Sequence, residues 1–256
     1  MSKWAVVTGA TAGIGESFTR ILANDGFNIV LVARDLDRMK ERAAHLESQF
    51  KVQTAIIQAD LATDEGCAKV EKYLRENQIE VLINNAGFGI NKAFSMSDIN
   101  AEQQLLDVLV RTPMRLMHTV IPQMMERNSG SIINVSSVAG WIAGGTYSAS
   151  KSYLTVLSES LHTEMSGTGV KISALCPGFT RTEFHERGRM RMNGLPEFMW
   201  LSADRVVMQA WKENQNGKVL TVPGWQYLLL STVSRFGPRP LVRKLGMNVR
   251  VRQRQK

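Results

Sequence analysis

The sequence predicts a doubly wound α/β fold, in which helices cover both faces of a parallel sheet. Short aliphatic and β-branched runs alternate along the chain with longer stretches of helical period, and this alternation is typical of strand–helix–strand units. The apolar runs are also nearly continuous, as expected for strands buried on both faces. In such folds the ligand crevice lies beyond the carboxyl ends of the strands.

Seven segments have the character of buried strands. They are Ala5–Val7, Asn28–Val32, Val52–Ile57, Val81–Ile83, Ser131–Val135, Lys171–Leu175 and Val219–Val222. Helical spacing is followed by Ile14, Phe18, Ile21 and Leu22, and later by Leu154, Leu157, Leu161 and Met165. We predict a single domain over residues 1–224 and a C-terminal extension over residues 225–256.

The first predicted strand ends in a glycine cluster, Thr8-Gly9-Ala10-Thr11-Ala12-Gly13-Ile14-Gly15. Three glycines permit a tight turn and let backbone N–H groups approach a pyrophosphate at the start of the next helix. An ordinary turn is the alternative interpretation. The strand before the cluster and the helix after it favour a phosphate-binding turn.

The second predicted strand ends in Val32-Ala33-Arg34-Asp35, where an acid is expected for NAD and an arginine for a 2′-phosphate. Ala33 stands where the acid would be, and the guanidinium of Arg34 can bind a phosphate through two hydrogen bonds. The sequence therefore favours NADP(H). The alternative is that Arg34 is a solvated charge at the start of a helix.

Further polar residues follow later strands. Asp60-Leu61 and Asn84-Asn85-Ala86-Gly87 stand at strand ends, where a shared ligand is a simpler explanation than repeated turns. Ser137 follows another strand, and Tyr147 and Lys151 are four residues apart, which places both on one face of a helix. A neighbouring ammonium lowers the pKa of a phenol, so this pair can act as a proton donor and acceptor.

Together these residues resemble the short-chain dehydrogenase/reductase family, over roughly residues 3–222. The resemblance implies a seven-stranded Rossmann-type domain and hydride transfer between a nicotinamide and an alcohol or carbonyl. It also implies that Tyr147 is the general acid and base, that Lys151 lowers the pKa of Tyr147 and binds the nicotinamide ribose, and that Ser137 binds the substrate oxygen. The implied cofactor-binding residues are Gly9, Thr11, Gly13, Ile14, Arg34, Asp60, Leu61, Asn85, Ala86, Gly87, Tyr147, Lys151, Pro177, Gly178 and Thr180.

One position departs from the family pattern. Leu109 stands where the family usually has an asparagine that supports a water linking the catalytic lysine to solvent. Pro113, four residues later, should kink or locally open this helix. We predict that the proton relay is weakened or rerouted, and that Leu109→Asn raises turnover.

Residues 181–202 form the predicted substrate lid, which contains many aromatic residues and methionines. Such a lid suits a hydrophobic carbonyl compound such as a steroid, lipid or acyl chain. Completion of the core or a contact between subunits in a homo-oligomer is the alternative. Arg187, Arg189 and Arg191 would attract an acidic group or simply be solvated.

The net charge of +8 comes from the C-terminal part of the chain. No acidic residue follows Glu213, whereas nine basic residues do, and residues 1–217 hold 22 basic against 23 acidic residues. Residues 225–256 therefore form either a peripheral membrane contact or a segment docked on the protein. They lack the interleaved aromatic residues expected for nucleic-acid binding.

Two cysteines and the absence of a secretory signal predict a cytoplasmic protein, peripheral to a membrane if the extension binds one. The four histidines have no metal-ligand spacing, so we assign no metal. The leading functional interpretation is an NADPH-dependent carbonyl reductase, and a non-catalytic dinucleotide-binding scaffold or redox sensor is the alternative.

Overall fold

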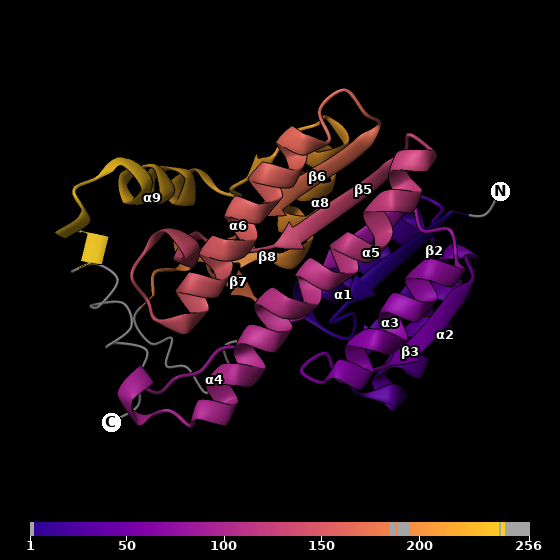
Figure 1. Cartoon of the computed structure of the whole chain (residues 1–256), viewed down its shortest axis with the longest axis horizontal. Helices are drawn as coiled ribbons and strands as arrows, with labels where there is room; N and C mark the ends of the chain where they lie inside the picture. The colour runs from indigo at the N-terminus through magenta and orange to yellow at the C-terminus, as the bar shows by residue number, and fades with distance from the viewer. Residues whose placement is uncertain (1–2, 185–187, 189–194, 241, 244–256) are drawn as a thin grey trace.

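The computed structural model describes residues 3–184, 188, 195–240 and 242–243 (Figure 1). Seven strands form one parallel sheet in the order β3-β2-β1-β4-β5-β6-β9. The strands are β1 (Trp4–Thr8), β2 (Asn28–Ala33), β3 (Thr54–Gln58), β4 (Val81–Asn84), β5 (Gly130–Val135), β6 (Val170–Leu175) and β9 (Leu220–Thr221). The predicted fold class is confirmed, and each predicted strand differs from the observed one by a few residues at its ends.

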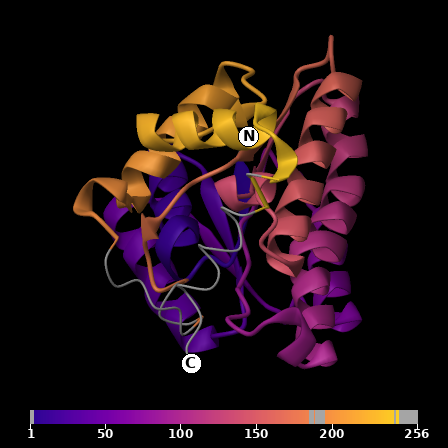
Figure 2. The ribbon, with the colours of Figure 1, turned by 90° about the vertical axis from the view of Figure 1, so that its left-hand side faces the viewer.

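Helices cover both faces of the sheet. They are α1 (Gly13–Asn24), α2 (Leu36–Phe50), α3 (Asp64–Glu76), α4 (Ile99–Leu106), α5 (Thr112–Glu126), α6 (Thr146–Glu164), α8 (Ala203–Gln215) and α9 (Trp225–Phe236). Apolar side chains of α3, α4, α5 and α6 pack on one face of the sheet, and those of α1, α2 and α8 on the other. Figure 2 shows α4, α5 and α6 gathered on the right of the molecule.

The sheet reverses its winding at β1, which pairs with β2 on one side and β4 on the other. Hydrogen bonds join the carboxyl ends of β1 and β4. The Thr8 hydroxyl accepts from the backbone N–H groups of Asn85 and Ala86 at 2.9 and 3.0 Å, and the Asn85 amide donates to the Thr8 carbonyl at 2.9 Å. A ligand crevice is expected where the winding reverses.

Two short elements complete the part of the fold that positions the site. Strands β7 (Thr180–Arg181) and β8 (Leu201–Ser202) form a separate parallel pair that joins the two ends of the predicted lid. Helix α9 follows β9 and contacts η3 (Val138–Trp141), the 3₁₀ turn after β5. No helix among the described residues is long and apolar enough to cross a bilayer.

Candidate active site

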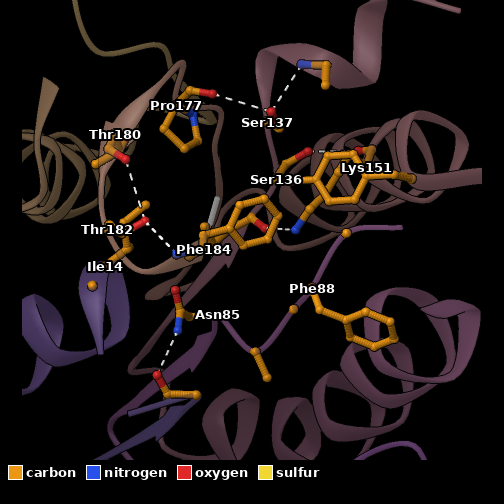
Figure 3. Close-up of a pocket in the computed structure, with 18 of the residues that line it drawn as sticks. Ile14, Asn85, Phe88, Ser136, Ser137, Lys151, Pro177, Thr180, Thr182 and Phe184 are labelled. Carbon is orange, nitrogen blue, oxygen red and sulfur yellow. Dashed lines mark hydrogen bonds between the residues drawn. The ribbon is translucent and has the colours of Figure 1, made fainter. Parts of the chain in front are cut away.

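A cavity of about 1080 Å³ opens at the carboxyl edge of the sheet. Every predicted site residue lines it, namely Gly9, Thr11, Gly13, Ile14, Arg34, Asp60, Leu61, Asn85, Ala86, Gly87, Ser137, Tyr147, Lys151, Pro177, Gly178 and Thr180. Figure 3 shows Ser137, Lys151 and Pro177 together at one side of the pocket and Ile14 and Asn85 at another. One cavity therefore extends from the glycine cluster to the Tyr147–Lys151 pair.

The glycine cluster forms the floor of this cavity at the start of α1. Gly9 and Gly13 have φ values of +67° and +57°, which disfavour a side chain. A Cβ on Gly9 would also lie 2.9 Å from the Asn85 amide. The N-cap residue of α1 is Ala12, which offers no side-chain hydrogen bond to the first turn. The N–H groups and dipole of α1 thus face the cavity without a side-chain cap, an arrangement that fits a phosphate group.

The far end of the cavity, beyond β2, holds Arg34 and Asp35. Arg34 is exposed, and Asp35 caps α2 by accepting from the Arg38 N–H at 3.0 Å. The Arg38 guanidinium binds both carboxylate oxygens of Glu183, at 2.7 and 3.1 Å. This ion pair connects α2 to the lid across the end of the cavity, and neither residue was predicted, because they are 145 positions apart.

The two serines after β5 have different environments. Ser136 is buried, and its hydroxyl is 2.7 Å both from the Lys151 carbonyl oxygen and from the Thr155 hydroxyl. The Ser137 hydroxyl accepts from the Ala139 N–H at 3.1 Å and donates to the Pro177 carbonyl at 3.4 Å, and it lies close enough to the Tyr147 phenol to act on its pKa. Ser137 is therefore the serine whose hydroxyl is next to the phenol.

Tyr147 and Lys151 lie in the first two turns of α6. The Lys151 ammonium donates to the Val135 carbonyl at 2.6 Å and lies 5.6 Å from the centre of the Tyr147 ring. Burial raises the pKa of Tyr147 to about 12, although the hydrogen bond from Ser137 acts to lower it. Burial also lowers the pKa of Lys151 to about 8. Desolvation therefore dominates the pKa of Tyr147 here, and the Lys151 ammonium bonds a backbone carbonyl; the lowering expected from Lys151 stays a prediction.

Leu109 lies beside Lys151 in a locally widened helix. Residues Asp107–Arg111 form the π-helical turn η2 between α4 and α5, in which the Thr112 N–H bonds the Asp107 carbonyl. Pro113 lacks an N–H group, so the Leu109 carbonyl has no α-helical donor. The Leu109 side chain is buried, and a Cβ on Gly87 would lie 2.9 Å from it and 3.9 Å from the Lys151 nitrogen. The predicted local opening near Pro113 therefore takes the form of a π turn, and Leu109 fills the space next to the lysine.

The part of the cavity beyond Tyr147 is largely apolar. It is lined by Phe88, Ile90, Val108, Ile142, Phe184 and Met199 together with the polar residues Asn91 and Gln104. The Phe184 ring lies 6.0 Å from the Tyr147 ring. The predicted lid residues Arg187, Arg189, Met190, Arg191 and Met192 lie outside the described residues.

Helix α9 contributes wall residues that the sequence did not predict. Tyr227, Leu230, Ser231 and Ser234 all line the cavity. Tyr227 is fully buried, and its ring occupies the space over Gly178, where a Cβ would be 2.0 Å from it. The predicted division of the chain at residue 224 stays a prediction, but the segment that directly follows it forms part of this site. Residues 241 and 244–256 of the predicted extension lie outside the described residues.

The model of the family described as short chain dehydrogenase matches residues 3–192. The very-long-chain 3-oxoacyl-CoA reductase of Homo sapiens is 28% identical over 245 residues, which cover 89% of this chain and 78% of the relative.

Two solved structures resemble the fold over nearly its whole length. A short-chain dehydrogenase from Sphingobium yanoikuyae in complex with NADPH has a TM-score of 0.83 at 30% identity, with 99% of this chain and 98% of that chain covered. A bulky-bulky ketone specific alcohol dehydrogenase from Comamonas testosteroni has a TM-score of 0.79 at 30% identity, with 99% and 96% covered.

Proposed function

The chain belongs to the short-chain dehydrogenase family, and from this premise we propose that it is an NADP(H)-dependent oxidoreductase that interconverts a hydrophobic ketone and a secondary alcohol. The observation that carries the proposal is the convergence of a hydroxyl, a phenol and an ammonium in one cavity. Ser137, Tyr147 and Lys151 provide these groups, and the uncapped start of α1 lies in the same cavity.

The chain's own residues account for binding of the cofactor. The first turn of α1 would hold the pyrophosphate, and Arg34 would bind the 2′-phosphate. Pro177, Gly178 and Thr180 would also contact the cofactor, as the family resemblance implies. When bound, NADP(H) supplies or accepts a hydride. The Sphingobium relative was solved with NADPH, which supports this choice of cofactor.

Tyr147 would transfer the proton. Its pKa near 12 keeps the phenol protonated at neutral pH, so the hydroxyl is ready to donate to a carbonyl oxygen during reduction. The Ser137 hydroxyl, next to the phenol, would hold the same oxygen. As the oxygen becomes an alkoxide, the proton moves from the Tyr147 oxygen to it. Lys151, mostly charged below pH 8, would stabilise the phenolate that remains.

The cavity also supports a bulky apolar substrate. Phe88, Ile142, Phe184 and Met199 form its walls near Tyr147, and apolar walls with a few polar groups are typical of sites for such ligands. One relative is named for reduction of very-long-chain 3-oxoacyl-CoA and another for bulky-bulky ketones. We infer that the carbonyl carries a large hydrophobic group on at least one side.

The test is a panel of aliphatic, aromatic and 3-oxoacyl ketones, in which oxidation of NADPH is followed by its absorbance. Tyr147→Phe should lower kcat by about 10²–10⁴-fold, since it removes the acid, while NADPH binding stays within a few-fold of wild type. Tyr73→Phe is the matched control, because that phenol lies on α3, outside the residues that line the cavity. NADPH binding without oxidation across the panel, and no effect of Tyr147→Phe, would support a non-catalytic scaffold instead.

A further inference from the structure

Helix α9 packs on the protein through a mostly polar side and exposes an apolar side, which is the reverse of the arrangement usual for a surface helix. Five large apolar side chains, Trp225, Leu228, Leu229, Val233 and Phe236, point outward and are each 49–79% exposed. We call these five residues the outer face of α9. Their positions lie within a single arc of the helix, because they follow the i, i+3, i+4, i+8 and i+11 spacing.

The inward side of the same helix is mostly polar. Gln226, Ser231 and Ser234 are each less than 10% exposed, and Tyr227 is buried with them. The Gln226 amide donates to the Phe198 carbonyl at 3.0 Å. Packing on the protein therefore fixes the orientation of α9 through its polar side and leaves the apolar side exposed. An exposed apolar arc of this kind indicates a binding surface for a further partner, because burying apolar area away from water is favourable.

The charges near the outer face indicate the chemistry of that contact. Arg239 and Arg243 are exposed just beyond the end of α9, and the sequence that follows adds five more basic residues. No acidic residue follows Glu213. Arg235 is partly neutralised by Glu159, 3.7 Å away. A second copy of the chain docked through this face would bring two strongly basic segments together, whereas an anionic lipid surface is complementary to them.

We propose that the outer face of α9 lies in the interface of an anionic membrane, with the arginines after it against the lipid headgroups. Trp225 and Phe236 mark the two ends of the face, and Trp, Phe and Leu are the residues that interfacial helices present to the lipid. A helix of this type lies in the plane of the interface without crossing it. This binding is independent of the proposed reaction.

The position of α9 gives membrane binding a consequence for substrate entry. Leu230 is 47% exposed at the surface and also lines the cavity, so it lies at the boundary between the outer face and the cavity wall. An apolar substrate dissolved in the bilayer would meet the cavity next to this residue. It could enter without first dissolving in water.

The test uses the full chain in flotation with vesicles of phosphatidylcholine alone and of phosphatidylcholine mixed with phosphatidylglycerol. The chain should float with the anionic vesicles and dissociate as salt is added. Leu229→Glu with Phe236→Glu should lower the partition coefficient at least tenfold. Arg239→Glu with Arg243→Glu should lower it by about fivefold or more for each charge. Neither pair lines the cavity, so NADPH binding reports that each variant is folded.

Met125→Glu is the matched control, because this residue is also a large exposed apolar side chain, 47% exposed, in the last turn of α5. That turn precedes β5 and so lies at the opposite edge of the sheet from the cavity. Equal flotation of the wild type, the Met125 control and both pairs would overturn the proposal. So would a wild-type dimer, measured by light scattering, that Leu229→Glu with Phe236→Glu converts to monomers while the wild type binds neither vesicle.

Discussion

Tyr227→Phe, which removes a single hydroxyl, should lower the stability of the protein and weaken ligand binding in the cavity. The Tyr227 hydroxyl accepts from the Phe179 N–H at 2.9 Å and donates to the Met199 carbonyl at 2.5 Å. These bonds join α9 to the loop after β6 and to the 3₁₀ turn η4 (Glu197–Met199), which precedes β8. Burial raises the pKa of Tyr227 to about 12, so the phenol stays neutral and keeps both bonds through the physiological range.

The magnitude follows from the two backbone groups that lose their partner. A buried polar group without a hydrogen bond costs about 1–3 kcal/mol, and the ring itself is retained in phenylalanine. With two such groups we expect a loss of at least ~2 kcal/mol in the free energy of unfolding, or at least about 4–8 °C in Tm for a chain of this size. Because Gly178 and Phe179 line the cavity beside this bond, KM for NADPH and for the ketone should rise more than kcat changes.

Thermal unfolding followed by circular dichroism gives the Tm, and steady-state kinetics give the two KM values. Tyr73→Phe is the control, since no hydrogen bond of its hydroxyl is found among the described residues, and burial alone raises the pKa of Tyr73. It should shift Tm by no more than about 1 °C. The reasoning is refuted if Tyr227→Phe unfolds at the same temperature as Tyr73→Phe with unchanged KM values.

Three other substitutions or conditions test the site. Burial lowers the pKa of Lys151 to about 8 from its usual 10.5. Between pH 8 and 10 the unfolded chain therefore binds more protons than the folded chain, so the free energy of unfolding measured in urea should rise with pH over this range. The kcat for reduction should fall as the pH passes 8, because the Lys151 ammonium loses its charge. Leu109→Asn should raise kcat at saturating cofactor and substrate, and an unchanged or lower rate counts against the relay interpretation. Glu183→Gln should release Arg38 and strengthen NADPH binding several-fold relative to NADH in a fluorescence titration; an unchanged ratio would mean that the ion pair does not influence cofactor choice.

The sequence predicted the fold and the residues of the cavity because both depend on local patterns. Continuous apolar runs marked the strands, and the polar residues directly after them met at one edge, as parallel strands require. The glycine cluster predicted a turn because glycine is the residue that adopts positive φ values most readily, and Gly9 and Gly13 have positive φ values in the structure. No resemblance to a family was needed to place Gly9 and Asn85 near each other.

The contributions of α9 and of the Arg38–Glu183 ion pair were missed for physical reasons. A buried side made of Gln226, Ser231 and Ser234 has none of the apolar periodicity by which a packed helix is recognised. The ion pair joins α2 to the lid through a contact that no local spacing encodes. Burial raises the pKa of Tyr147, an effect that its spacing from Lys151 in the sequence does not reveal, so the lowering expected from Lys151 stays a prediction.

The short β7–β8 pair has a consequence for how much the lid of this chain can vary in length. Thr180 pairs with Leu201 and Arg181 with Ser202, so the two ends of the stretch between these strands lie side by side. Closing a longer segment between fixed ends costs only about 0.6 kcal/mol for each doubling of its length. The stretch between the two strands can therefore be lengthened, or replaced by that of a relative, at little cost in stability. The sheet, the glycine turn and the proton donor would stay unchanged.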